Sequence, residues 1–186
     1  MKKYELTAEF IEQWGKKLFR IKALISFGSV EAGELGGYVE KEDNLAQDGD
    51  AWVCDNAWVC DNVMVCDNAR VYGNARVCDN ARVCDNVMVC DNARVCGDAR
   101  VYGDARVCGD ARVCDNADYL LIGRIGSRFS FTTFFKNKDK GITVSCGCFL
   151  GTIAEFRAKV TDTHGNNKHA KIYNLAADMA ELQILG

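Results

Sequence analysis

Proline is missing from all 186 residues, and histidine occurs only twice. Stacked strands suit such a chain, because every residue keeps a backbone N–H for pairing. No apolar run reaches the length of a membrane helix, and a net charge of −3 is too small to indicate a general nucleic-acid or membrane binder. The opening residues, MKKYELTAEF, lack the apolar segment of a signal peptide, so we expect a cytoplasmic protein.

Internal repetition dominates what is present. From Ala51 to Asn116 the chain consists of eleven consecutive six-residue units, such as AWVCDN, VMVCDN and ARVYGD, without an insertion. Valine holds one position in all eleven, and alanine or valine lies two places before it. Such self-similarity is typical of a solenoid, in which each unit buries its apolar residues against its neighbours.

Each unit predicts a short strand followed by a tight turn. The two apolar residues of a unit are two apart, so both point inward, and the residues between and after them point outward. The Asp–Asn, Gly–Asn or Gly–Asp pair that follows tolerates the positive φ of a corner. Val39 and Leu45 hold the position of the repeat alanines on the N-terminal side, and Tyr119, Ile125 and Phe131 keep the valine register on the C-terminal side.

The pattern resembles that of the hexapeptide-repeat family, in which three units form one triangular coil of a left-handed parallel β-helix. The resemblance implies a mainly β fold, in which a small N-terminal β-hairpin and a C-terminal α/β segment cap the two ends of the helix. Cysteine or tyrosine stands where that family often has glycine. The order of the segments, including GELGGYVEKEDNL and a helix pair with THGNN, also resembles hexapeptide proteins of bacterial and phage genomes.

We expect three parts: an N-terminal hairpin cap (1–38), a β-helix (39–127) and a C-terminal hairpin with two helices (128–186). The N-terminal hairpin is expected within 10–24, and the second hairpin from the segments 129–135 and 142–148. Thr152 and Glu155 form a capping box that begins the first helix, and Gly165 ends it. The second helix is expected over 167–182, with its apolar residues on one side: Ile172, Leu175, Met179 and Leu182.

Stacking in coils of three units places residue i beside residue i+18, so outward side chains form rows. The candidate partner-binding residues in these rows are Trp58, Arg76, Arg94, Arg112, Arg70, Arg82, Arg100 and Arg106. Trp52, Trp58, Met64 and Met88 are expected to be exposed near the N-terminal half, where they could form a subunit interface.

Two interpretations of these charged rows stay open. In the first, the arginines and the corner aspartates neutralise one another and keep the repeat soluble. In the second, a rigid rod with regular charge is a docking surface. Its acidic corners could imitate a phosphate backbone, although duplex DNA carries a denser charge of one per ~1.7 Å. Alternatively, its arginines could bind phosphate or carboxylate directly.

Nine of the eleven cysteines recur in the repeat, so we expect reduced thiols at outward positions that tolerate a small side chain. A straight row of thiols does not form a tetrahedral metal site, and parallel Cβ vectors disfavour disulfides. Cys146 and Cys148 are interpreted as strand residues. No metal site and no cofactor are predicted.

Many hexapeptide proteins are acyltransferases that act as homotrimers with a histidine base. Here His164 and His169 both lie beyond the repeats, and no loop interrupts the coils. His164 is expected to end a helix. We therefore expect a protein without enzymatic activity, and a hexapeptide-type acyltransferase is the alternative.

The expected function is recognition of a macromolecule by the rod or by the C-terminal cap. The resemblance to phage proteins suggests an inhibitor of bacterial defence, similar to an anti-CRISPR protein, that blocks the nucleic-acid site of a nuclease. The expected partner is a protein, such as a nucleic-acid-binding host defence protein. Direct nucleic-acid binding and a homo-oligomer remain open, and no membrane contact is expected.

Overall fold

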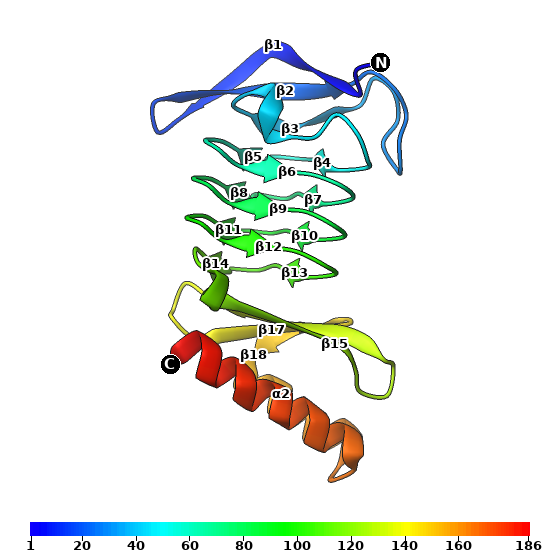
Figure 1. Ribbon diagram of the computed structural model, residues 1–186, viewed down its shortest axis with the longest axis vertical. Helices are drawn as coiled ribbons and strands as arrows, with labels where there is room; N and C mark the ends of the chain where they lie inside the picture. Colours follow the sequence, from blue (N-terminus) through cyan, green and yellow to red (C-terminus); the bar gives the residue numbers. More distant parts are fainter.

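The structure is a computed structural model that describes all of residues 1–186. A β-solenoid forms the middle of the molecule, an antiparallel pair of strands lies at its N-terminal end, and a second antiparallel sheet with two helices lies at its C-terminal end (Figure 1). The solenoid strands have two residues each: β4 Trp52–Val53, β5 Trp58–Val59, β6 Met64–Val65, β7 Arg70–Val71, β8 Arg76–Val77, β9 Arg82–Val83, β10 Met88–Val89, β11 Arg94–Val95, β12 Arg100–Val101, β13 Arg106–Val107 and β14 Arg112–Val113.

Each solenoid strand pairs in parallel with the strand one coil further along. Trp58 pairs with Arg76, and Arg76 pairs with Arg94. The backbone N–H of Trp58 donates to the carbonyl of Ala75 at 3.0 Å, which is one example of the ladder between coils. The pairs form three faces that we name after their first solenoid strand: the β4 face (β4, β7, β10, β13), the β5 face (β5, β8, β11, β14) and the β6 face (β6, β9, β12).

The repeat valines and the residues two places before them fill the inside of the solenoid. All eleven valines are 0% exposed, and the unit-starting alanines are equally buried. They form one cluster of 30 buried residues that runs from Tyr4 at one end to Phe135 at the other. The predicted inward positions are therefore confirmed.

The corners link successive coils through their acidic residues. Asp55, Asp61, Asp67, Asp79, Asp85 and Asp91 all have a positive φ, between 55° and 65°. Each carboxylate accepts a hydrogen bond from the backbone N–H eighteen residues later, for example from Gly73 to Asp55 at 2.9 Å and from Gly97 to Asp79 at 2.9 Å. Asparagine side chains add a second ladder, in which Asn62 donates to Asn80 at 3.0 Å. The corner residues thus serve both the turn and the stacking.

The N-terminal strands cover one end of the solenoid. β1 (Tyr4–Gln13) pairs antiparallel with β2 (Lys16–Ala23), and β2 pairs with β3 (Leu35–Val39), which continues in parallel onto β5. The first strand begins at Tyr4, earlier than the expected segment 10–24. η1 (Glu42–Asn44) follows β3.

Lys3 satisfies the carbonyl groups at this end. Its side chain is 1% exposed, and its Nζ donates to the carbonyls of Asp48, Gly49 and Ala51 at 3.2, 3.3 and 3.0 Å. Of these carbonyls, that of Ala51 lies in a buried contact, where it needs a hydrogen-bond donor. Burial lowers the pKa of Lys3, because it disfavours the charged form.

The C-terminal register predicted for Tyr119, Ile125 and Phe131 is wrong. The coils end at β14, and η2 (Asn116–Asp118) turns the chain away. Asp118 stabilises this turn by accepting the backbone N–H groups of Cys114 and Asp115 at 2.9 and 3.0 Å. The following strands form an antiparallel sheet: β15 Tyr119–Ile125, β16 Ser130–Lys136, β17 Ile142–Cys146 and β18 Phe149–Thr152.

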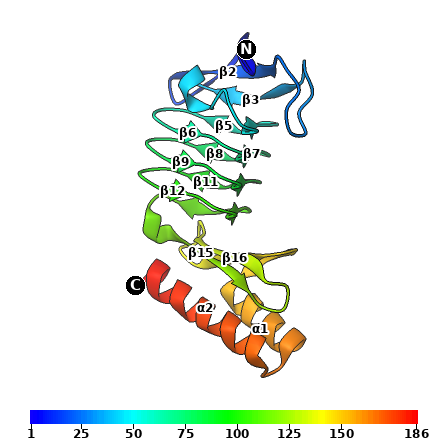
Figure 2. The ribbon, with the colours of Figure 1, turned by 45° about the vertical axis from the view of Figure 1, so that its right-hand side comes forward.

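Two helices pack on this sheet (Figure 2). α1 (Ile153–His164) begins at the predicted capping box, in which Glu155 N–H donates to Thr152 Oγ1 at 3.3 Å, and Gly165 follows its last residue. α2 (Lys168–Leu185) is three residues longer at its C-terminus than expected. No helix in the structure combines the length and apolar character that crossing a bilayer requires.

α2 packs through a face that the sequence pattern did not single out. Its buried residues are Ala170, Tyr173, Ala176, Ala177, Ala180 and Ile184. The four apolar residues that were expected on one side, from Ile172 to Leu182, do share a side, but that side is exposed. Small alanines allow α2 to lie close to the sheet, and the larger apolar side chains remain in solvent.

Candidate binding surface

The β5 face carries the first predicted row in the predicted order. Trp58, Arg76, Arg94 and Arg112 lie on adjacent strands and pair in sequence from β5 to β14. Trp58 is only 5% exposed, however, because the β1–β2 turn covers it. Trp14 of that turn packs edge-on against Trp58 with a distance of 4.9 Å between ring centroids. The prediction that Trp58 is exposed for partner binding is therefore wrong.

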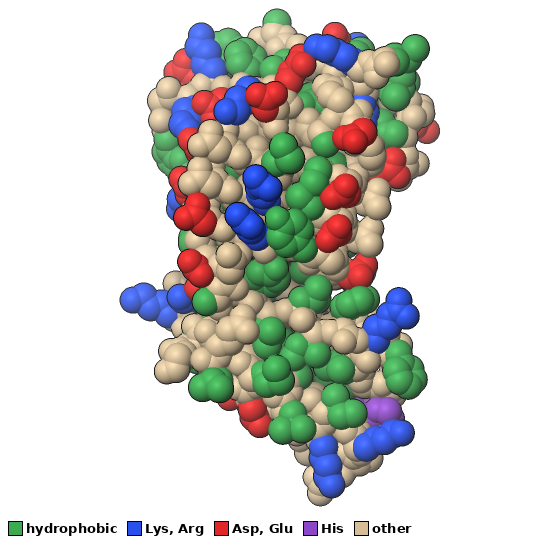
Figure 3. Space-filling view, in the orientation of Figure 1, with side chains coloured by type: hydrophobic (Ala, Val, Ile, Leu, Met, Phe, Trp, Pro, Cys, Tyr) green, Lys and Arg blue, Asp and Glu red, His purple; other side chains and the backbone are tan.

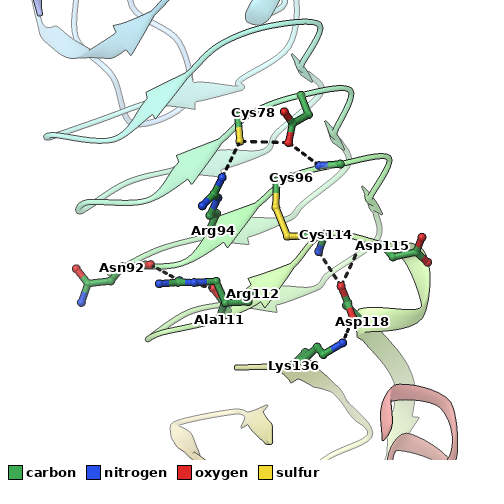
Figure 4. The surroundings of a disulfide bond; sticks show 12 residues. Cys78, Asn92, Arg94, Cys96, Ala111, Arg112, Cys114, Asp115, Asp118 and Lys136 are labelled. Atoms are coloured by element: carbon green, nitrogen blue, oxygen red, sulfur yellow. Dashed lines mark hydrogen bonds and ion pairs between the residues drawn. A yellow bond between two sulfur atoms is a disulfide. The ribbon is translucent and has the colours of Figure 1, made fainter. Parts of the chain in front are cut away.

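Aromatic rings also hold two arginines of this row. Arg76 lies over the Trp58 ring at 5.7 Å, and Arg94 lies over the Trp14 ring at 5.2 Å. Arg94 also donates to Cys78 Sγ at 3.9 Å, whereas Arg112 donates to the carbonyls of Ala111 and Asn92 at 2.9 and 3.3 Å (Figure 4). Weak contacts fix these side chains without neutralising their charge.

The other two faces present their arginines more openly. Arg82 and Arg100 are neighbours on the β6 face, and both are exposed. On the β4 face, Arg106 is exposed and Arg70 is half-buried, with Met88 between them in the row. Arg106 also lines a cavity of about 300 Å³ between the solenoid and β16, together with Met88, Asp104 and Thr133.

Lys138, through its hydrogen bond and charge, and more weakly the charge of Arg112 lower the pKa of Asp110, so the interpretation that arginines and corner aspartates balance one another stays open. None of the seven repeat arginines, however, forms an ion pair within 4.0 Å. Geometry explains this, because the arginines lie on the flat faces, whereas the corner carboxylates bind backbone N–H groups of the next coil. Figure 3 shows acidic side chains in rows that flank basic ones over β6, β9 and β12. The arginines therefore keep their charge available for an anion.

The predicted exposed patch of tryptophan and methionine does not exist as a unit. Trp52 is 0% exposed and packs between Phe27 and Tyr4, at ring distances of 5.4 and 6.2 Å. Met88 is half-buried, and among the four expected residues only Met64 is exposed. N-terminal residues cover both tryptophans, so this part of the surface is already occupied within the chain.

The repeat cysteines point outward, but neighbouring side chains bury several of them. Cys60, Cys78 and Cys96 form a small buried cluster with Leu18, Tyr38 and Trp58. The expectation that all of them are thiols is wrong. Cys90 bonds to Cys108, and Cys96 bonds to Cys114, as Figure 4 shows. Pairing of parallel strands brings the Cα atoms to 4.6 and 4.4 Å, which is within reach of a disulfide.

Burial also suppresses ionisation of the five unbonded thiols of the repeat. It raises the pKa of Cys54 to about 11 and that of Cys60 to about 12. The pKa values of Cys66, Cys78 and Cys84 are raised as well, again mainly by burial. Since the thiolate is the reactive form, these cysteines are poor nucleophiles near neutral pH.

The raised pKa of a buried thiol predicts that it reacts slowly with an alkylating reagent. Iodoacetamide at pH 8 is expected to modify the exposed Cys148 rapidly and Cys60 at least about a hundredfold more slowly, because a raised pKa leaves little thiolate. The rate at Cys60 should rise about tenfold per pH unit as long as the fold persists. Timed labelling with peptide mass spectrometry measures both rates, and labelling in denaturant is the control. Equal rates at pH 8 in the folded protein would contradict the burial of Cys60.

Two groups bring thiols and carboxylates together as possible metal donors. Cys66, Asp67 and Cys84 have donor atoms within 4.8 Å of one another, as do Glu40, Cys60 and Asp61. In the second group Lys16 already pairs with both carboxylates. The first group offers three donors, short of the four of a structural zinc site. That no metal is bound stays a prediction.

A further cavity of about 380 Å³ lies in the C-terminal unit, between the sheet and α1. His164, Cys146 and Tyr173 line it together with Arg128, and His164 stacks on Tyr173 at 5.7 Å. Burial raises the pKa of Tyr173 to about 12. His164 is the last residue of α1, as expected, and no feature of the sequence indicated the cavity that it lines.

Sequence comparison finds one similarity within the repeats. Residues 63–79, 69–83, 81–97 and 93–109 each match the YdcK beta solenoid repeat. No curated protein matches the chain. The matched ranges cover a minority of the chain and coincide with strands β6 to β13, so they agree with the β-solenoid seen in the structure and carry no activity with them.

Proposed function

We propose that the chain is a non-catalytic binding protein whose arginine-bearing solenoid faces bind an anionic surface of a macromolecular partner. The observation that carries this proposal is that no repeat arginine forms an ion pair with a carboxylate within 4.0 Å. Arginines on adjacent strands lie about 4.8 Å apart along the rod and repel one another. A carboxylate or phosphate between them relieves this repulsion and accepts paired hydrogen bonds.

A rigid rod favours such binding, because little conformational entropy is lost when the arginines meet a partner. The β6 face supports the proposal best, since Arg82 and Arg100 are exposed neighbours whose guanidinium groups, unlike those of Arg76 and Arg94, lie over no aromatic ring. We propose a protein as the partner, with direct nucleic-acid binding as the second possibility.

A narrower proposal is that the partner is a nuclease of bacterial defence, which the rod would block. It rests on the resemblance to phage proteins, and the acidic edges would face the basic channel of the nuclease. Asp98 and Asp104 stand on these edges and accept only neutral amide hydrogens, from Asn80 and Asn86. Faces and edges are thus two separable binding surfaces of opposite charge.

The test compares matched variants of face and edge. Arg82→Gln with Arg100→Gln removes charge from the face, Asp98→Asn with Asp104→Asn removes it from the edge, and Lys159→Gln on α1, an exposed lysine outside both surfaces, is the control. Each protein is used to capture partners from a bacterial lysate and is titrated with a 20-base-pair DNA duplex between about 50 and 200 mM salt.

We expect the face variant to lose its captured protein about tenfold or more, and the control to keep it. Loss of the captured protein with the edge variant alone would support the narrower proposal, in which the acidic edges bind a nuclease. DNA binding that weakens steeply with salt and with the face variant would identify nucleic acid as the ligand. Capture that survives both variants would contradict a role for the solenoid surface.

A hexapeptide-type acyltransferase is the alternative, and one observation favours keeping it. His164 lines a cavity large enough for part of an acyl donor. Turnover of an acyl donor that is lost in His164→Ala, with the fold intact, would overturn the non-enzymatic proposal.

We also propose the finer description of the fold: a left-handed β-helix of hexapeptide repeats with a cap at each end. The six-residue spacing of the strands and the three strands of each coil support it.

The cytoplasmic location stays a prediction. The two disulfides are more typical of an oxidising compartment, and thiol counting in rapidly quenched cells would test this point.

A further inference from the structure

α2 exposes a continuous apolar stripe on the side that faces away from the sheet. The members are Ile172 (39% exposed), Leu175 (62%), Met179 (57%), Leu182 (77%) and Leu185 (54%). Hydrophobic side chains gather over the lower part of the molecule in Figure 3, where Figure 1 places α2. A stripe of five large apolar side chains on one helix face is typical of an interaction surface.

The spacing of the stripe points to another helix as its occupant. Ile172, Leu175, Met179 and Leu182 follow one another at intervals of three, four and three residues. This is the a/d spacing of a coiled coil, in which side chains of one helix pack between those of the next. The buried residues of α2, such as Tyr173, Ala177 and Ala180, occupy other helical positions. One helix therefore serves two packing surfaces.

We propose that α2 pairs antiparallel with α2 of a second copy of this chain, through this stripe and around a twofold axis. The apolar spacing reads the same in both directions. An axis between Leu175 and Met179 therefore places Leu175 against Met179 of the partner subunit, and Ile172 against Leu182 of the partner subunit. A twofold interface needs such a self-complementary surface.

The charges beside the stripe fit the antiparallel arrangement. Lys168 and Lys171 lie in the N-terminal half of α2, whereas Asp178 and Glu181 lie in its C-terminal half. Arg157 of α1 holds both acids at 2.7 and 2.8 Å, so they are ordered and still carry excess negative charge. On this axis Lys171 faces Gln183 of the partner subunit and comes close to Glu181 of the partner subunit, and Lys168 lies beside the negative C-terminal end of the partner helix, whereas parallel pairing would place like charges together.

This inference is independent of the proposed function, because α2 and the arginine faces lie in different parts of the chain. A dimer formed through α2 would carry two solenoids, each with its arginines free. Failure of the pairing would leave the binding proposal untouched, and the reverse also holds.

Sedimentation equilibrium of the full chain between about 1 and 200 µM tests the pairing. Cys148→Ser serves as the background, so that this exposed thiol cannot form an intermolecular disulfide. We expect the mass to rise with concentration from one chain of 20.5 kDa toward twice that value. Leu175→Glu with Leu182→Glu should remain monomeric throughout, with an unchanged circular dichroism spectrum, because both positions are exposed.

Leu35→Glu is the matched control, since Leu35 is 49% exposed at the opposite end of the molecule. It should dimerise like the background protein. Lys168→Glu with Lys171→Glu tests the orientation, and antiparallel pairing predicts a dissociation constant raised about tenfold at low salt. An unchanged constant would overturn the antiparallel arrangement. A monomer at 200 µM, or a dimer that survives the two glutamates on the stripe, would overturn the inference itself.

Discussion

Replacing Val83 by aspartate is expected to unfold the solenoid or to lower its free energy of unfolding by about 4–5 kcal/mol. Val83 is 0% exposed, and the inside of the solenoid is lined by valine and alanine from every coil. No polar group there could pair with a carboxylate. Urea unfolding followed by far-ultraviolet circular dichroism measures the loss.

Arg82→Asp is the matched control for this prediction, because it places the same side chain one residue earlier on the same strand. Arg82 points outward and is exposed, so its replacement should change the stability by less than about 1 kcal/mol. Equal losses for the two variants would mean that inside and outside are assigned wrongly, and the binding surface would then be wrong with them.

Trp52→Ala is expected to lower the free energy of unfolding by about 3–5 kcal/mol. Trp52 is 0% exposed and joins the first coil to the N-terminal segment through Tyr4 and Phe27. Its removal would leave a cavity where these parts meet. Urea unfolding again measures the change, and the N-terminal strands should become more accessible to protease.

Trp14→Ala is the control, since Trp14 is 57% exposed and makes its main contact at the edge of Trp58. We expect a loss of about 1 kcal/mol for this variant. A loss at Trp52 no larger than that at Trp14 would contradict the burial described for the first coil.

The inside of the solenoid could be predicted from the sequence because one short pattern repeats eleven times. The side-chain alternation of a strand fixes which residues face inward once the valine position is known. The same pattern could not show what covers the outward residues. Trp52 and Trp58 are buried by residues of the N-terminal segment, whose position depends on long-range packing rather than on the repeat.

In the C-terminal unit, too, local features could be predicted from the sequence, whereas features that depend on long-range packing could not. The capping box located the start of α1, because the signal lies within four neighbouring residues. The strand β15 was mistaken for a further coil, since alternating apolar residues fit either a coil or an antiparallel sheet. The buried side of α2 could not be predicted from the helix alone, because it depends on contact with the sheet. The alanines of α2 pack closely against that sheet, and the leucines lie on the other side.

The disulfides were missed for a related reason. The spacing of eighteen residues placed the cysteines on adjacent strands, but their Cβ atoms were expected to point in parallel directions, which disfavours a disulfide. The strand pairs bring the Cα atoms of each bonded pair within 4.6 Å. Cys60 and Cys78 have the same strand relation and remain unbonded, so pairing of the strands permits a bond without requiring it.

The uniform step between coils has a consequence for how such a protein can change in length. Because every coil contacts mainly the coil before and after it, eighteen residues can be duplicated or deleted as a block without disturbing either end. Each block would add or remove three strands, one per face, together with their outward side chains. The extent of the charged surface can therefore be altered in whole steps while Lys3 and Asp118 go on terminating the stack at their own ends.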